Sequence, residues 1–261
     1  MLDQANRRYQ ASLVPVVALV ALLFVPAVAD AQNVRTSLCL FGCPEGAPAT
    51  NHLIVRPIYA LSYNTQNRVA DWVSYRVTRG AIGIASRLSR EPKLDEFGLD
   101  TLANEDFLEA EGDLVRSSWV PLVSFAGTPY WDDVNFLSNQ VARSSKLNQG
   151  AWYGLEWAIR NLANRDEQIF VITGPIFHAD GPALTLNTVT SHRVPDAFFK
   201  IVANARGEGS VFVFDQTAPV HLHHCEQLST IDEVERLTGL VFFPEVADFM
   251  LQPLESKLGC F

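Results

Sequence analysis

The chain has 261 residues, 48% of them hydrophobic and 19% charged, which is the composition of a globular protein with a sizeable core and excludes a disordered one. Its formal net charge is −9, from 20 basic and 29 acidic side chains. An acidic surface repels phosphate and forgoes counterion release, so this charge argues against a dedicated nucleic-acid-binding protein, although it allows a local basic cleft.

The first segment of the chain has the pattern of an export signal. Two arginines precede an apolar run that closes on small residues at Ala29 and Ala31, which predicts a secretory signal peptide over residues 1–31. The rest of the chain, 32–261, is then a single mature domain that is secreted or periplasmic. The alternative is a membrane anchor through 13–28, although this run is short for a span and contains two prolines.

Four cysteines follow the leader, at Cys39, Cys43, Cys225 and Cys260. An even number of cysteines in an exported chain indicates two disulfides, and three pairings are open. A zinc site is the weaker alternative. His223 and His224 adjoin Cys225, but no C-x-x-C pair is present.

The next elements indicate a β-rich start followed by a long irregular segment. Residues 52–64 and 68–78 are β-rich runs joined by a polar turn, which predicts a hairpin. Residues 80–112 have no sustained period and are expected to be irregular apart from one short helix; such segments are often functional. The stretch NFLSN at 135–139 predicts a short strand.

The second half of the chain predicts two helices and three strands. The longest amphipathic pattern spans 146–163 and predicts a helix. A second helix is predicted at 230–239, with Thr230 as N-cap, Glu233 completing a capping box and Gly239 at the C-cap. Strands are predicted at 169–177, 197–204 and 210–216. Clustered strands with few helices indicate an α+β domain around a mainly antiparallel sheet.

One face of the longer helix carries polar side chains at a spacing of four residues: Asn148, Trp152, Glu156 and Arg160. An amide, a carboxylate and a guanidinium on one face can bind a hydrated cation and a phosphate. From the spacing alone, the simpler interpretation is a surface ion pair between Glu156 and Arg160, which contributes a few tenths of a kcal/mol.

Several stretches, in one order, resemble the family of non-specific DNA/RNA endonucleases with a ββα-metal site: CLFGCP, NFLSN, LNQGAWYGLE, VITGPIF, SHRVPDAFFKI, VFVFDQTAP, TIDEVERLTGL and the terminal LGC. The likeness runs over nearly the whole mature chain. It implies the ββα-metal nuclease fold, a central, mainly antiparallel sheet flanked by helices. It also implies that Cys39 pairs with Cys43 and that Cys225 pairs with Cys260.

The resemblance also implies roles for particular residues. In that family an Asp-Arg-Gly-His stretch precedes a helix with a metal-binding asparagine. The histidine takes a proton from the attacking water, and the asparagine holds Mg²⁺. The resemblance places Asn148 at the metal asparagine, Glu156 at a glutamate that steadies the hydrated metal, and Arg160 and Arg116 at arginines that neutralise phosphate. Arg87 matches a further phosphate-binding arginine if a gap is allowed.

The chain departs from the family at the catalytic stretch itself. VRSS stands where the family has Asp-Arg-Gly-His, so Ser118 takes the place of the histidine and Ser117 that of the glycine. The family's proline–glutamine pair is Ala142 and Arg143 here. A serine hydroxyl is not basic near neutral pH, and loss of a general base typically lowers the rate by about 10²–10⁴.

These departures predict a pseudo-nuclease with a structural, accessory-subunit or binding role, in which the Mg²⁺ that the resemblance implies is bound weakly or no longer bound. Nucleic-acid binding is expected to be weak or absent. The partner would be an unknown protein, or a membrane complex if the leader is retained, and a homodimer is compatible with the resemblance. The alternative is an active Mg²⁺-dependent, sugar-non-specific endonuclease that uses another base, with His52, His178, His192, His221, His223 and His224 as the available imidazoles.

Overall fold

The computed structural model describes residues 35–96, 98–103, 105–107, 113–166, 168–178, 185–186, 192–247 and 250–261. The predicted leader, residues 1–31, lies outside the described residues. Residues from Ala31 to Phe261 form one compact unit. In the part of the chain that the structure describes, no helix is both long and apolar enough to cross a membrane.

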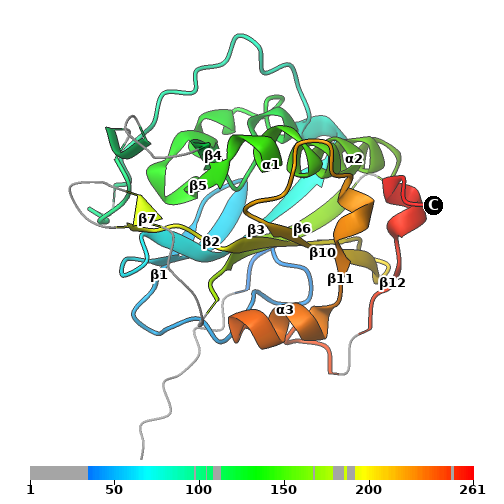
Figure 1. The fold of residues 1–261 in the computed structure, drawn as a ribbon. Coiled ribbons are helices and arrows are strands. Elements are labelled where there is room, and N and C mark those ends of the chain that lie inside the picture. The colour runs from blue at the N-terminus through cyan, green and yellow to red at the C-terminus, as the bar shows by residue number, and fades with distance from the viewer. Residues whose placement is uncertain are drawn as a thin grey trace, which may run out of the picture. The chain divides into compact units, whose positions relative to one another are not determined.

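A twisted sheet forms the centre of this unit (Figure 1). Its strands are, in spatial order, β1 (His52–Val55), β2 (Tyr59–Asn64), β3 (Val69–Thr78), β6 (Gln168–Ile176), β9 (Ala197–Ala203), β10 (Glu208–Asp215) and β11 (Leu228–Ser229). These neighbours pair antiparallel, and only β12 (Gln252–Pro253) pairs parallel, with β10. The predicted α+β fold with a mainly antiparallel sheet is therefore confirmed.

Helices cover both faces of the sheet (Figure 1). On one face lie α1 (Ser145–Gln149) and α2 (Ala151–Asp166), and on the other lies α3 (Ile231–Thr238). Because side chains alternate along a strand, Phe198 of β9 joins the α2-side core and Phe199 joins the α3-side core. The same alternation directs Lys200 toward the α2 side.

The helix predicted at 146–163 is divided at Gly150 into α1 and α2. A Cβ at Gly150 would lie 2.4 Å from the Val220 carbonyl oxygen, so only glycine allows this close approach. The helix at 230–239 is confirmed as α3, with the Thr230 hydroxyl accepting from the Glu233 N–H and Gly239 in the left-handed region at φ 72°. The Glu233 carboxylate pairs with Arg236 instead of completing the capping box.

The strand predicted at 135–139 is wrong. This stretch forms short 3-10 helices, η4 (Trp131–Asn135) and η5 (Leu137–Asn139). The Asn139 backbone N–H donates to the Phe136 carbonyl and its side-chain amide donates to the Val134 carbonyl. These local hydrogen bonds use groups that a strand would offer to a neighbouring strand.

The first predicted β run, 52–64, is two strands rather than one, because the chain turns back after Val55 and β1 pairs with β2. The hairpin of β2 and β3 is confirmed. Residues 79–81 and 105–107 form the 3-10 helices η1 (Arg79–Ala81) and η2 (Glu105–Phe107), and the other described residues of the 80–112 segment are irregular. The remaining short 3-10 helices are η3 (Leu122–Ser124), η6 (His224–Gln227) and η7 (Glu255–Leu258).

Two features complete the fold. Strand β4 (Leu114–Ser118) pairs antiparallel with β5 (Gln140–Ser144), and β7 (Thr185–Leu186) pairs with β8 (His192–Arg193). The sequence did not predict any of these four strands. Both disulfides have the pairing that the resemblance implies, Cys39–Cys43 and Cys225–Cys260.

Candidate functional site

A hairpin followed by a helix forms the candidate site. In the β4–β5 pair, Ser118 stands opposite Gln140 and Val115 stands opposite Arg143. The chain leaves β5 through Ser144, whose hydroxyl caps α1 by accepting from the Leu147 N–H at 3.1 Å. The end of the hairpin is thus fixed close to the first turns of the helical pair.

A cleft of about 350 Å³ opens between this hairpin and α2. Most site residues predicted from the sequence line it: Ser118, Arg116, Asn148, Glu156 and Arg160. Arg87 is exposed and is not part of the lining; Arg90, three positions along the same irregular segment, lines the cleft in its place. The site that the sequence predicted is therefore brought together in space, with one arginine exchanged for another.

No imidazole lines this cleft. All six histidines of the sequence lie among the described residues, and the lining includes none of them. At the position where the resemblance places the catalytic base, Ser118 offers a hydroxyl, and its backbone is held by pairing with β5. A hydroxyl at this position can donate or accept a hydrogen bond but cannot take a proton from water near neutral pH.

Asn148, which is half-buried and lines the cleft, shares a hydrogen-bond network with the buried side chains of Ser117 and Arg143. The Ser117 hydroxyl donates to the Asn148 Oδ1 at 2.6 Å. The Arg143 Nη1 donates to the same oxygen at 3.1 Å and also to the Ser117 hydroxyl. Two donors therefore converge on the oxygen that the resemblance implies as a metal ligand.

The Arg143 side chain is fully buried among aromatic rings. Its guanidinium carbon lies 3.7 Å from the centroid of a Trp152 ring and 4.9 Å from that of Phe198. This stacking compensates part of the cost of burying the charge. Burial lowers the pKa of Arg143 to about 9, an effect that Glu156 partly opposes, and the side chain stays cationic at neutral pH.

Glu156 is the acidic group of the cleft and already has three neighbours. Its Oε1 accepts from the Trp152 Nε1 at 2.7 Å and lies 3.5 Å from the Lys200 Nζ, while its Oε2 lies 4.0 Å from Arg160. The Glu156–Arg160 pair is therefore buried and loose, not the surface pair that the spacing suggested. Burial lowers the pKa of Lys200 to about 7, and the nearby Glu156 limits that shift.

The residues present do not fit a divalent cation at Asn148. An amide oxygen has two lone pairs, and the Ser117 and Arg143 donors occupy both. A guanidinium 3.1 Å from that oxygen would also repel Mg²⁺, which binds through carboxylates and oxygen ligands. We therefore derive no chemical step through a metal ion at this site.

The outer wall of the cleft is basic. The Arg116 Nη2 donates to the Arg90 carbonyl at 3.1 Å, which ties the hairpin to the irregular segment after β3. Partial burial lowers the pKa of Arg116, and Glu91 opposes this effect. With Arg160 on α2, these arginines give the cleft the local positive charge that the overall charge of −9 conceals.

The sequence did not predict the roles of three residues: Arg90, Arg143 and Lys200. Arg143 stood out as a departure from the family, but its contact with Ser117 depends on the β4–β5 register, which the sequence did not predict. Lys200 had a visible signal, because it is the one charged residue in the apolar run AFFKIVA of β9.

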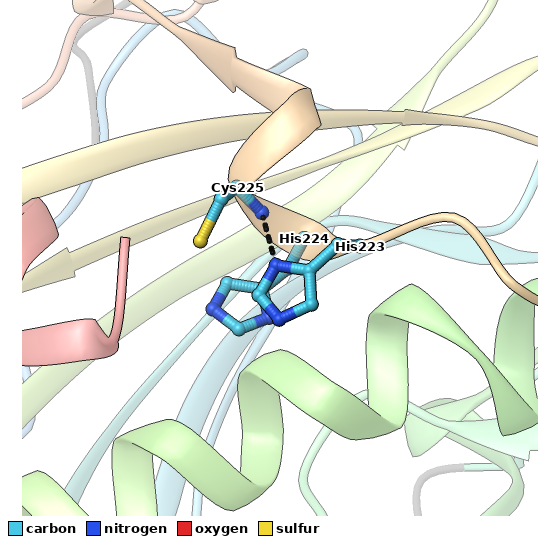
Figure 2. Close-up of side chains that lie close together, drawn as sticks. All are labelled: His223, His224 and Cys225. Atoms are coloured by element: carbon cyan, nitrogen blue, oxygen red, sulfur yellow. Dashed lines mark hydrogen bonds between the residues drawn. The ribbon is translucent and has the colours of Figure 1, made fainter. Parts of the chain in front are cut away.

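His223, His224 and Cys225 lie together, with potential ligand atoms within 4.8 Å of one another (Figure 2). The Cys225 sulfur is bonded to Cys260 and is therefore no thiolate ligand. The His223 Nδ1 accepts from the Cys225 backbone N–H, and the His224 Nε2 donates to the Leu258 carbonyl. The two rings thus fix the loop after β10 beside α2, and the predicted zinc alternative lacks its thiolate.

Comparison with known proteins agrees with this architecture. A family model described as DNA/RNA non-specific endonuclease matches residues 41–249. The chain is 35% identical to a nuclease of Serratia marcescens over 93% of each chain, and 28% identical to the mitochondrial endonuclease G of Bos taurus over 90% of this chain and 83% of that protein. A chain in the crystal structure of the EndoG/EndoGI complex has the same fold, with a TM-score of 0.69 and 21% identity over 83% of this chain and 94% of that one.

Proposed function

Because the chain belongs to the DNA/RNA non-specific endonuclease family, we propose that it is an exported nuclease-like protein that has lost hydrolytic activity and kept the cleft as a binding site. One observation carries the proposal: the cleft contains Ser118 where the family resemblance implies a histidine, and none of the six histidines lines it. Without a proton acceptor beside the attacking water, we expect hydrolysis to fall by at least about 10²–10⁴.

An active enzyme with another base is the competing proposal, and the positions of the candidate bases argue against it, since none of the six histidines lines the cleft and Lys200 is buried outside it. Lys200 has a pKa near neutrality, which suits a general base. However, its side chain is 0% exposed and it does not line the cleft. It therefore has no route to a substrate water. His192 is also buried, and burial lowers its pKa to about 4.

Export is supported by the covalent structure. Two disulfides are present, and such bonds persist in oxidising compartments outside the cytosol. We therefore propose that the mature protein is secreted or periplasmic. Mass spectrometry of the native N-terminus tests this proposal, because cleavage after residue 31 supports export and retention of Met1 supports a membrane anchor that would hold the protein near a partner complex.

The test of lost activity uses plasmid DNA and RNA with Mg²⁺. The wild type is compared with Ser118→His, which restores the imidazole, and with Ser118→Ala, which controls for loss of the hydroxyl. Asn148→Ala reports whether any residual cleavage depends on this cleft. We expect the wild type, Ser118→Ala and Asn148→Ala to cleave at the same background rate.

Robust cleavage by the wild type that Asn148→Ala abolishes would overturn the proposal. A gain of activity in Ser118→His supports it and shows that the missing base is the main defect. If Ser118→His stays inactive while the wild type is also inactive, the proposal holds and the other departures, at Ser117 and Arg143, also block hydrolysis.

A further inference from the structure

The Asn148 amide is held in a defined orientation by its neighbours. A guanidinium has only donors, so the atom of Asn148 that faces Arg143 must be the oxygen. The Ser117 hydroxyl, which accepts from Arg143, then donates to that same oxygen. The Asn148 Nδ2 makes no hydrogen bond to any described residue, and Asn148 lines the cleft. What the residue has left to offer a ligand is therefore a donor.

The positive charge beneath the cleft is fixed and only partly neutralised. Arg143 has no accessible surface, is stacked on Trp152, and forms no ion pair within the described part of the chain. Its Nε and Nη2 are buried without hydrogen-bond partners. Glu156, the nearby acid, is shared with Lys200 and Arg160. In a poorly solvated setting this charge acts on whatever enters the cleft.

Two departures from the family pattern are physically one feature. Ser117 stands on β4 and Arg143 on β5, two pairs away in register, yet their side chains meet at Asn148. A glycine at position 117 would remove the hydroxyl that bridges the other two residues. Ser117 and Arg143 thus act together to close the Asn148 oxygen to a cation.

We propose that Arg143 supplies this cleft with an internal cation at neutral pH in place of a divalent metal ion, so that the cleft binds a phosphodiester of a nucleic-acid strand without metal. This inference rests on the proposed function, since a hydrolytic enzyme of this fold would need the metal. The groups available to the phosphodiester are the guanidinium groups of Arg90, Arg116 and Arg160, the Ser118 hydroxyl and the Asn148 Nδ2.

Two measurements on the wild-type protein test this replacement. Titration with Mn²⁺, a spectroscopic substitute for Mg²⁺, is followed by electron paramagnetic resonance of the free ion. Binding of a short fluorescein-labelled single-stranded oligodeoxynucleotide is followed by anisotropy at low salt, with and without EDTA. We expect no Mn²⁺ to bind, and oligonucleotide binding that EDTA leaves unchanged and that salt weakens.

Variants of Arg143 separate its charge from its shape. Arg143→Gln is expected to weaken oligonucleotide binding roughly tenfold or more, because a charge beneath the phosphate is removed. It is also expected to make Mn²⁺ binding measurable, most clearly with Ser117→Gly in the same chain. Arg143→Lys keeps the charge and should still exclude Mn²⁺. Arg236→Gln, an exposed arginine on α3 across the sheet, is the matched control and should bind like the wild type.

Binding of Mn²⁺ by the wild type would overturn the replacement, as would oligonucleotide binding that EDTA abolishes or that cannot be detected at low salt. Because these measurements are made on the wild type, they decide the question even if a variant fails to fold. A different result would overturn the proposed function, namely cleavage of plasmid DNA or RNA by the wild type. If the wild type does not cleave but binds Mn²⁺, the proposal that Arg143 replaces the metal ion is wrong, and the proposal of lost hydrolysis stands.

Discussion

Phe199 and Lys200 are neighbours on β9, and they enter two different kinds of core. On the α3 side, Phe199 packs edge-on against Phe242 with ring centroids 5.5 Å apart, in a cluster of apolar side chains and the Cys39–Cys43 disulfide. On the α2 side, Lys200 lies over Trp152 at 3.6 Å, close to the buried charges of Glu156 and Arg143. Among the described residues, the α2-side core thus contains a cluster of charges that are costly to bury, whereas the α3-side core around Phe199 is apolar.

The difference indicates which face is adapted for binding. Replacing a buried ion pair with apolar residues of similar volume is often neutral or stabilising, so stability alone does not explain such a cluster. Three buried nitrogens without hydrogen-bond partners also belong to this cluster, Lys200 Nζ and the Nε and Nη2 of Arg143. We interpret this face as the one that gives up stability for the electrostatics of the cleft.

The largest effect on stability is expected from a substitution in the apolar core on the α3 side. Phe199→Ala removes a fully buried ring and should lower the free energy of unfolding by about 3–5 kcal/mol, measured by urea denaturation. The loss should not depend on pH between neutral and mildly alkaline conditions, because the ring packs against apolar side chains such as Phe242. A loss that varies strongly across this range would show that the two faces are not independent.

The second-largest effect on stability is expected from a substitution in the charged cluster on the α2 side. Glu156→Gln keeps the shape of the side chain and the acceptor for Trp152 but removes the negative charge shared by Lys200 and Arg160. Leaving buried cations without their counter-charge typically costs about 3–5 kcal/mol, and we expect the lower end because Lys200 can lose its proton. Urea denaturation at neutral pH measures it, with Glu233→Gln on the surface of α3 as the control. Equal stability of the two variants would contradict a charged core.

The sequence predicted the apolar side of the molecule better than the charged side. The runs 169–177, 197–204 and 210–216 are mainly apolar, with Lys200 as the buried exception, and each became a strand of the central sheet, since burial on both faces favours such residues. Strands β4 and β5 carry polar and charged residues in LVRSS and QVARS, so no period of two marked them. The Gln216 side chain, from a segment far along the chain, accepts from the Ser144 N–H and donates to the Ala142 carbonyl of β5, and local pattern does not reveal such contacts.

The candidate site was also predicted only in part. Spacing along one helix placed Asn148, Glu156 and Arg160 on one face, and the structure gathers them with Arg116 and Ser118 around one cleft. Spacing could not show that Arg143 reaches Asn148, because that contact depends on the register of an unpredicted hairpin. Similarly, the close approach of Val220 that breaks the helix at Gly150 comes from a segment far along the chain.

The pH dependence of the free energy of unfolding tests the contribution of Lys200 to the charged core. Its pKa falls to about 7 in the folded protein, whereas an unfolded lysine titrates near 10.4, so between these values the unfolded state binds more protons. Stability should therefore be lowest below pH 7 and rise by about 1 kcal/mol per pH unit above it, until the unfolded lysine also loses its proton. The groups around Lys200 are Glu156 and Arg160 on α2 and Arg143 on β5.

The check is a comparison of urea denaturation at neutral and alkaline pH for the wild type and Lys200→Met. The methionine fills a similar volume without charge, so the variant should lack the rise between pH 7 and pH 8, a range that lies below the Arg143 pKa of about 9. A parallel rise in both proteins would assign the effect to another group. His192, with its pKa lowered to about 4, titrates at lower pH and does not interfere.

The smallest effect concerns the hydroxyl that joins the hairpin to the helix. Ser117→Ala leaves Arg143 with one acceptor and the Asn148 oxygen with one donor, so we expect a loss of about 1 kcal/mol in unfolding free energy. Ser138→Ala is the control, since its hydroxyl is also buried and bonds Asp95 away from Arg143. A double-mutant cycle of Ser117→Ala with Arg143→Gln should show coupling, whereas Ser138→Ala with Arg143→Gln should be additive. Additivity in the first cycle would mean that Ser117 and Arg143 do not act as one feature, and the contrast between the two faces would then rest on Glu156 and Lys200 alone.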